Sequence, residues 1–236
     1  MRIFAVDTSA KSASAAVTEN GEIKGEFFIN TMLTHSETLM PMTDALLKST
    51  RLSLSDIDCL AVNTGPGSFT GLRIGIAAIK GMAFAVKKPC IAVSTLESMA
   101  YNLSEPDTVL CAVMDARCNQ VYNALFDVSS DIPQRLCDDR ALTIDELSKE
   151  LEALGKKVVL VGDGAKLCFS RMSGIECDLH IAAENVRYQR ASSTALAAER
   201  LFEEVKTVGA DTLMPQYLRL PQAQRELMAK QKLSNK

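Results

Sequence analysis

The run Asp7–Ser12 carries residue types that can bind an anion or a metal ion. Four apolar residues, expected to form a short strand, end at Asp7, and hydroxyl side chains follow at Thr8, Ser9 and Ser12. Hydroxyls and backbone N–H groups in such a turn can surround an anion, while the Asp7 carboxylate can hold a hydrated Mg²⁺. An ordinary polar hairpin would have the same composition, so the sequence leaves both interpretations open.

The turn Gly65-Pro66-Gly67 is a second candidate for anion binding, because it precedes an expected helix whose first amides would be free. However, the run matches neither GxxxxGK[ST] nor GxGxxG. The pattern therefore favours a forced turn that starts a helix over a phosphate loop. Ser68, which follows it, is expected to be a turn or helix-start residue.

The remaining chemistry-bearing residue types do not form a recognisable catalytic pattern. The chain has 2 histidines, His35 and His180, and they do not form an HxxxH pair. A histidine-rich metal site is therefore close to excluded. There is no GxSxG nucleophile motif either.

Composition narrows the class of protein further. The net charge of −3 gives no sign of direct nucleic-acid binding, which needs clustered basic residues. Only the tail Arg219–Lys236 is basic; we expect it to be a solvated end, with an RNA contact as the alternative. The 7 cysteines include no CxxC pair, which indicates a reducing compartment. With no long apolar run, a cytoplasmic protein without a membrane partner is expected.

Strands that alternate with helices predict an α/β class with covered sheets. A helix is expected from Thr34, whose hydroxyl caps it while Glu37 completes a capping box, and Pro41 should kink or restart it. The other expected elements are strands at 3–6, 14–18, 22–29, 60–63 and 90–93 and helices at 71–86 and 194–206. A strand near Tyr217–Leu220 and a last helix from Gln222 complete the chain.

The pattern of the first residues recurs in the middle of the chain. Val109–Met114 is an apolar run that ends at Asp115, and a returning strand follows at 121–126, as after Asp7. The recurrence suggests two similar lobes. We expect a first lobe at 1–104, a smaller second lobe at 105–206, and a segment 207–236 that packs back on the first lobe.

The expected helix at 71–86 is apolar nearly all round. Its charges are Arg73 and Lys80, seven residues apart and so on one narrow edge. The sheet side is predicted to be Gly75, Ala78 and Met82. The flanks of the charged edge, which a monomer would expose, are predicted to be Ile76, Ala77, Ala83 and Phe84. A helix of this kind should be covered on both sides.

The helix before it has the same excess of apolar residues. Leu39, Met42 and Leu46 form one stripe, and Met40 and Leu47 form a second on the far side. Two such helices make an exposed patch that expects a partner, unless the second lobe covers it.

Several motifs along the chain resemble one family. The longest is the run from Asn63 to Gly75 that continues to Lys80-Gly81, and it closely resembles the signature of the bacterial TsaB (YeaZ) family. Further matches are Ala5–Ser9, His35-Ser36, Asp115-Ala116-Arg117, Gly162–Ala165 and Pro215–Arg219. The resemblance implies an α/β, actin-like (ASKHA, ribonuclease H-like) duplicated two-lobe fold.

The resemblance also implies a role in forming threonylcarbamoyladenosine next to the anticodon of tRNA. The chain would be the non-catalytic scaffold that docks a metal-bearing TsaD-type transferase, joined by a small TsaE-type ATPase, and would meet tRNA only through the complex. The sequence leaves open whether two copies of the isolated chain pair through the same helices, as the structural likeness of partner and self would allow. The implied interface residues are Met40, Leu47, Ile76, Ala77, Lys80, Ala83 and Phe84.

The same resemblance implies that this chain lacks catalytic residues. The catalytic relative carries an HxxxH helix where this chain has Ser94–Ala100, which contains no histidine. Asp7, Thr8 and Ser9 would remain as a nucleotide half-site, with no tightly bound cofactor and at most weak ATP or ADP contact with Mg²⁺ in the complex. The alternative hypothesis is a small actin-like ATP-dependent phosphotransferase that uses Asp7 and Mg²⁺.

Overall fold

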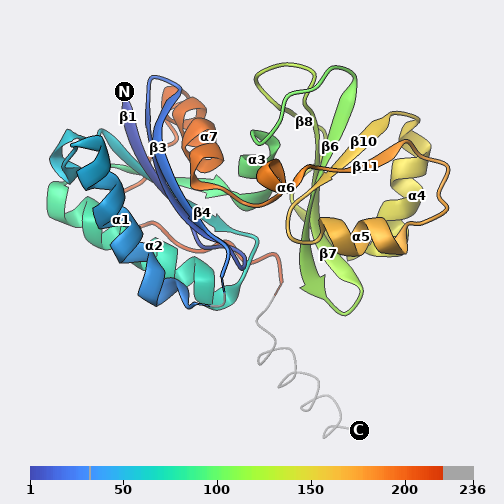
Figure 1. Ribbon diagram of the computed structural model, residues 1–236, viewed down its shortest axis with the longest axis horizontal. Helices are drawn as coiled ribbons and strands as arrows, with labels where there is room; N and C mark the ends of the chain where they lie inside the picture. The colour runs from blue at the N-terminus through green and yellow to red at the C-terminus, as the bar shows by residue number, and fades with distance from the viewer. Residues whose placement is uncertain (32, 220–236) are drawn as a thin grey trace, which may run out of the picture.

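The computed structural model describes residues 1–31 and 33–219 and consists of two lobes side by side (Figure 1). The first lobe contains a five-stranded sheet in the order β3-β2-β1-β4-β5. The second contains a sheet in the order β11-β10-β6-β7-β8, with β9 paired to β7. Each lobe has its own apolar core, so each sheet buries its own faces.

The first sheet forms largely where the apolar runs predict strands. Its strands are β1 Arg2–Asp7, β2 Ala13–Glu19, β3 Glu22–Ile29, β4 Cys59–Gly65 and β5 Cys90–Ser94. β1, β2 and β3 are antiparallel, whereas β4 and β5 run parallel to β1. Two long helices, α1 His35–Thr50 and α2 Phe69–Val86, cover one face, and a short 3₁₀ turn, Leu54–Asp56, follows α1.

The second lobe repeats the arrangement of the first. Its strands are β6 Thr108–Arg117, β7 Gln120–Asp127, β8 Gln134–Arg135, β9 Arg140–Thr143, β10 Lys157–Val161 and β11 Leu179–Ile181. β6 pairs antiparallel with β7 and parallel with β10, as β1 pairs with β2 and β4. Its helices are α4 Ile144–Leu154, α5 Ala165–Arg171 and the short α6 Glu184–Arg187. The predicted duplication is therefore present in the topology.

Helix α1 begins where its capping residues predict. Thr34 is the N-cap, and its N–H donates to the Glu37 carboxylate at 3.0 Å, which satisfies a donor that the first turn leaves unpaired. The helix continues through Pro41 to Thr50, so the proline does not divide it.

The position of helix α7, Ala191–Glu203, contradicts the predicted boundary of the second lobe at residue 206. The expectation assigns this helix to the second lobe, but Ala191, Ala195 and Ala198 are buried against Ile3 and Ala61 of the first sheet. Alanines on this face allow the helix to lie close to the strands. The short helix α3, Thr95–Ala100, lies between the lobes, because Leu96 and Met99 pack in the core of the second lobe while α3 also contacts α7.

Helix α2 also differs from expectation. Ile76 and Ala83, predicted to face a partner, are 5% and 1% exposed and pack in the core of the first lobe. The buried stripe is instead Leu72, Gly75, Ile76, Ile79, Met82 and Ala83. This stripe follows the i, i+3, i+4, i+7 spacing of one helix face, and it includes the two residues that the sequence interpretation placed opposite the sheet.

Among the described residues, α2 is the one helix long and apolar enough to suit a membrane span, and 39% of its 18 residues are buried inside the lobe.

The segment after α7 returns to the first lobe: Val208 exchanges backbone hydrogen bonds with Cys90, and Leu213 is 1% exposed. Tyr217 to Arg219 do not form the predicted strand. Leu220 and the predicted helix from Gln222 lie outside the described residues.

Glu26 joins α7 to β3. Its carboxylate accepts hydrogen bonds from Arg190 Nε (3.0 Å) and Nη2 (2.5 Å), and from the Ser192 N–H (3.0 Å) and hydroxyl (2.9 Å). Only 11% of its side chain is exposed. All four donors lie at the start of α7, so this single carboxylate holds the helix to the edge strand.

We predict that Glu26→Ala lowers the free energy of unfolding by about 3 kcal/mol, because it leaves a partly buried guanidinium and a helix N–H without their acceptor. Glu22→Ala, on the same strand with a 74% exposed side chain, is the matched control and should change it by less than about 0.5 kcal/mol. Urea denaturation measures both. Equal effects of the two substitutions would contradict this role of Glu26.

Candidate functional site

A cleft of about 750 Å³ lies between the lobes and is the first of two candidate sites. The first lobe contributes the β1–β2 hairpin and the turn before α2, with Ser9, Lys11 and Gly67 among the lining residues. The second lobe contributes the end of β6 and the loop after β10, and residues 216–219 complete the wall. The predicted half-site therefore borders this cleft, but its three residues have different roles.

Asp7 does not face the cleft as the Mg²⁺ hypothesis requires. The residue is 1% exposed, and its Oδ1 accepts hydrogen bonds from the Ser9 N–H at 2.7 Å and the Ser9 hydroxyl at 2.8 Å. Its Oδ2 accepts from Asn63 Nδ2. Burial raises the pKa of Asp7, and the hydrogen bonds from Ser9 and Asn63 lower it. Both carboxylate oxygens accept hydrogen bonds inside the lobe, so the structure gives Asp7 the role of an internal acceptor.

Thr8 forms the contact between the hairpin and α2. Its hydroxyl donates to the Gly71 carbonyl at 2.8 Å. A Cβ on Gly71 would lie 2.1 Å from the Thr8 carbonyl oxygen, and a Cβ on Gly75 would lie 2.4 Å from the Thr8 hydroxyl. These glycines are therefore required for close packing of the helix on the hairpin. This packing accounts for part of the glycine-rich signature that could otherwise indicate an anion site.

Two further contacts hold the hairpin. The Ser9 carbonyl accepts from the N–H of Ser68, the N-cap of α2, at 2.7 Å. His35 Nε2 lies 2.8 Å from the Ala10 carbonyl oxygen, which gives this half-buried histidine a structural contact at the rim. The Asp7 carboxylate and the Ser68 N–H therefore both have hydrogen-bond partners within the first lobe.

The second lobe places two carboxylates at the cleft. Asp115, near the end of β6, has a 32% exposed side chain, and its Oδ2 lies 3.7 Å from Arg117 Nη1. Asp163 follows β10 and accepts from Gln189 Nε2 at 3.1 Å. Burial raises the pKa of Asp163, and the charge of Asp115 raises it further. The sequence interpretation named neither Asp163 nor Gln189 as a site residue, although Asp163 lies within the family match Gly162–Ala165.

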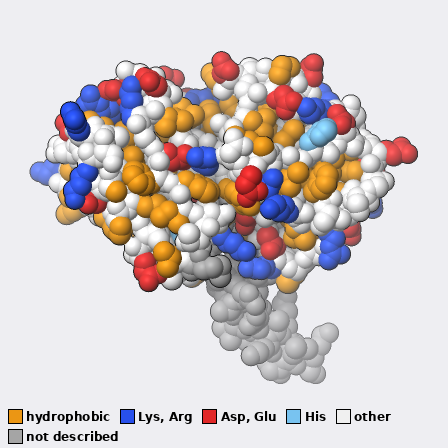
Figure 2. Space-filling view, in the orientation of Figure 1, with side chains coloured by type: hydrophobic (Ala, Val, Ile, Leu, Met, Phe, Trp, Pro, Cys, Tyr) orange, Lys and Arg blue, Asp and Glu red, His pale blue; other side chains and the backbone are white. Residues whose placement is uncertain are grey.

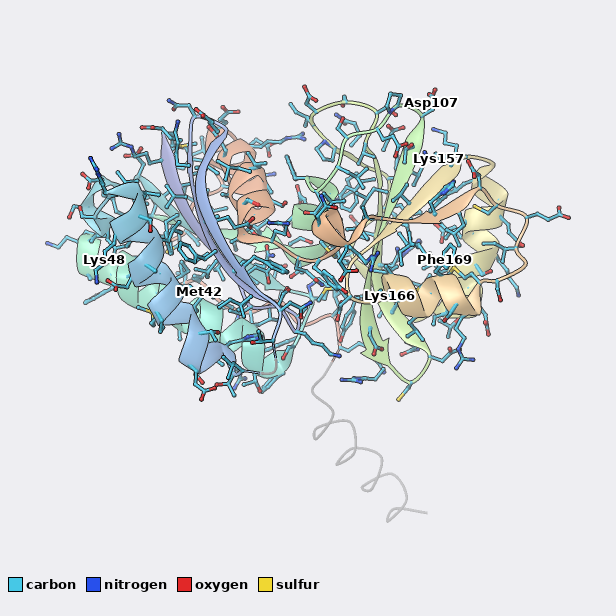
Figure 3. All side chains as sticks on the ribbon, viewed as in Figure 1. Met42, Lys48, Asp107, Lys157, Lys166 and Phe169 are labelled. Atoms are coloured by element: carbon cyan, nitrogen blue, oxygen red, sulfur yellow. The ribbon has the colours of Figure 1, made fainter. Side chains whose placement is uncertain are left out.

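Four basic side chains also line this cavity: Lys11, Arg117, Lys166 and Arg219. Lys166 lies on α5, on the side of the second lobe that faces the first (Figure 3). The charges of the lining side chains are thus mixed, with four cations and two carboxylates. This arrangement can attract anions and can also pair charge across the cleft; the Lys11 charge, for example, lowers the pKa of Asp163.

The outer faces of α1 and α2 form the second candidate site, which we call the helix face. It comprises Met40 and Leu47 on α1, and Ala77 and Phe84 on α2. Met40 is 50% exposed and Phe84 82% exposed; Ala77 is exposed, and Leu47 is half-buried. Figure 2 shows hydrophobic side chains gathered over the first lobe near α1 and the edge of its sheet.

Three of the seven predicted interface residues do not belong to this exposed face. Ile76 and Ala83 are in the core, as described above. Lys80 is half-buried, and its Nζ donates to the carbonyl oxygens of Asp211 and Leu213, both at 3.2 Å. The charge of Lys80 is therefore used by the returning C-terminal segment.

The helix after β5, α3, has one carboxylate, Glu97, and no histidine. Ser94 caps α3 by accepting from the Glu97 N–H at 3.2 Å. Within residues 1–31 and 33–219, no three His, Cys, Asp or Glu side chains are grouped as a metal site would require.

Comparison with solved structures defines the class of fold. YeaZ from Pseudomonas aeruginosa has a TM-score of 0.78 at 25% identity, over 92% of this chain and 99% of that chain. An activator of 2-hydroxyisocaproyl-CoA dehydratase from Clostridium difficile has a TM-score of 0.51 at 12% identity, over 87% and 97%, and it shows likeness of fold alone. The protein has the α/β, actin-like (ASKHA, ribonuclease H-like) fold of two duplicated lobes.

Sequence comparison then defines the family. A family model described as TsaD, tRNA N6-adenosine threonylcarbamoyltransferase, matches residues 30–227. The tRNA threonylcarbamoyladenosine biosynthesis protein TsaB of Escherichia coli K12 is 32% identical over 234 residues, 98% of this chain and 100% of that protein. TsaB of Bacillus subtilis is 28% identical over 235 residues, with the same coverage. The chain belongs to this family, among its TsaB (YeaZ) proteins.

The packing of α2 on the hairpin predicts opposite effects for two glycines of one helix. Gly75→Ala should destabilise the fold by about 1–3 kcal/mol, because the new methyl group overlaps the Thr8 hydroxyl. Gly81→Ala, where a Cβ meets nothing within 4 Å, should instead stabilise it by about 0.5–1 kcal/mol through helix propensity. Thermal or urea unfolding of the isolated protein measures both, and stabilisation by Gly75→Ala would contradict the close packing.

The hydrogen bonds of Asp7 predict a graded response to substitution. Asp7→Ala removes the acceptor of three buried donors and should cost about 3 kcal/mol or more of unfolding free energy. Asp7→Asn should cost about 1 kcal/mol, because the amide oxygen still accepts from Ser9 and the Asn63 Oδ1, which is unpartnered in the structure, can accept from the new amide.

The same carboxyl predicts a pH dependence. A raised pKa means that the folded state holds the proton more tightly than the unfolded state, so this group reduces stability as pH rises from the ordinary value of 3.8 through the folded pKa. The unfolding free energy of the wild type should therefore fall relative to that of Asp7→Asn over this pH range. Above the folded pKa, the difference between the two proteins should stay constant. A difference independent of pH, measured by urea unfolding from pH 4 to 8, would contradict this assignment.

Proposed function

We propose that the chain is the non-catalytic subunit of the machinery that forms threonylcarbamoyladenosine next to the anticodon of tRNA. In this proposal it docks a TsaD-type threonylcarbamoyltransferase through the helix face. Membership of the TsaB proteins, which are named for tRNA threonylcarbamoyladenosine biosynthesis, supports the pathway. The family model shared with the transferase supports a paralogous partner of similar fold.

The exposure of Phe84 is the single observation that carries the docking proposal. A phenylalanine that is 82% exposed on a long helix, beside a helix with a 50% exposed methionine, gains free energy when a partner covers it. Aromatic side chains near the centre of an interface commonly carry much of the binding energy. The two helices already share one core and lie side by side, so the face is preformed (Figure 1).

The internal role of Asp7 supports a non-catalytic subunit. The rival phosphotransferase hypothesis depends on Asp7 as the Mg²⁺ ligand, and that carboxylate is occupied by Ser9 and Asn63. Chemistry would then belong to the partner, and the TsaE-type ATPase and tRNA would be reached through the complex. A cytoplasmic location fits these partners.

The helix face would also suit pairing of two copies in the absence of the partner. A two-fold axis places the same patch on both subunits, so a face that fits a paralogue of similar fold can also fit itself. Partner binding and self-association should therefore compete for Phe84.

We predict that Phe84→Asp weakens binding to the TsaD-type paralogue of the same organism by at least about 100-fold, because it places an unpaired carboxylate in an apolar contact. Phe169→Asp on α5, where the side chain is 42% exposed on the outer part of the second lobe, is the matched control and should leave binding unchanged (Figure 3). Isothermal titration of the purified pair measures the affinity. Unchanged affinity for Phe84→Asp would exclude the helix face as the docking surface.

The choice of residue matters for this test. Ile76→Asp would bury a charge in the core of the first lobe and would report on folding in place of docking. Light scattering of the free protein with and without Phe84→Asp measures self-association in parallel. A dimer unaffected by the substitution would place the self-contact elsewhere.

A further inference from the structure

The chain from Val208 to Arg219, which we call the strap, crosses the first lobe after α7. It begins with two backbone hydrogen bonds between Val208 and Cys90, of 2.8 and 2.9 Å. Leu213 inserts into the first core, and the Gln216 N–H donates to the Thr64 carbonyl at 2.8 Å. The strap is therefore attached along its length to the edge of the first sheet and to the end of β4.

Both charged side chains of α2 hold the strap. Lys80 Nζ donates to the carbonyl oxygens of Asp211 and Leu213, and Arg73 Nε donates to the Tyr217 hydroxyl at 2.9 Å. Arg73 also lies 3.9 Å over the ring of Phe69, which stacks on Tyr217 at 5.1 Å. The two cations of this otherwise apolar helix, Arg73 and Lys80, thus both donate hydrogen bonds to the strap.

The far end of the strap binds the second lobe. Arg219 Nη1 donates to the Ala116 carbonyl at 2.9 Å, across the cleft that residues 216–219 line. Ala116 precedes three consecutive residues with left-handed backbone, Arg117, Cys118 and Asn119, at φ values of 66°, 55° and 57°. The strap therefore joins α2 of one lobe to the end of β6 in the other.

The strap adds a non-covalent contact between two lobes that the backbone joins at two covalent crossings. One covalent crossing leads from α3 into β6, and the other leads from α6 to α7. In Figure 1 α3 and α6 lie between the lobes, and the strap ends below them, near the lower ends of β6 and β7. Two crossings can act as a hinge, whereas a tie on the other side of the cleft opposes opening.

We propose that the strap is an interlobe latch, anchored on α2 by Arg73 and Lys80 and closed on the second lobe by Arg219. Attached, it limits the separation of the lobes and the width of the cleft. Released at either end, it allows the lobes to move apart. This inference does not depend on the docking proposal, because every contact in it lies within one chain.

Hydrogen exchange of the full-length protein tests the latch at two separate positions. Arg219→Ala removes the closing contact, so the backbone amides of 116–120 should exchange about five- to tenfold faster. Lys80→Met removes both anchor hydrogen bonds while keeping the apolar stem. It should accelerate exchange in 209–216 and, because the latch loosens as a whole, also in 116–120, on the opposite lobe.

The second effect distinguishes a latch from a local contact. Arg171→Ala on α5 removes a cation from the second lobe outside the strap and should leave 116–120 unchanged, and exchange of β1 normalises each variant for global unfolding. Acceleration at 116–120 by both Arg219→Ala and Lys80→Met supports the latch. No effect of Lys80→Met at 116–120, or an equal effect of Arg171→Ala, would overturn it.

Discussion

The close packing of α2 on the β1–β2 hairpin is the contact on which the rest of the structure depends. It exists because Gly71 and Gly75 carry no Cβ where the backbone and hydroxyl of Thr8 lie. This contact holds α2 against the hairpin beside Asp7, whose carboxylate accepts hydrogen bonds from Ser9 in the hairpin and Asn63 on β4. A side chain at either glycine would displace the helix and, with it, both candidate sites.

The duplicated lobes have used the same strand–Asp–turn–strand unit in different ways. In the first lobe Asp7 is buried and accepts hydrogen bonds only from its own lobe. In the second lobe Asp115 stays partly exposed at the cleft, next to Arg117 and the left-handed turn. The same unit therefore places its carboxylate inside the lobe in one half and at the cleft in the other.

Helix α2 combines three functions on three sides. Its inner stripe supports the sheet, its two cations bind the strap, and its outer side presents Ala77 and Phe84 to solvent. The charges that make one edge polar are satisfied within the chain. What remains unpaired on the outer side is apolar, which is the character expected of a surface that a partner covers.

The sequence by itself determined the class of fold, most strand positions, the start of α1 and the duplication, because these follow from local periodicity and capping between residues close in the chain. It also marked α1 and α2 as helices with more apolar residues than one sheet could cover. Only the tertiary structure decided that α7 belongs to the first lobe, that Ile76 and Ala83 are core residues, and that Lys80 binds the strap. These outcomes depend on partners distant in sequence: Asp211 is 131 residues from Lys80. The rotational position of a helix that is apolar nearly all round is set by what packs on it, and no local pattern contains that information.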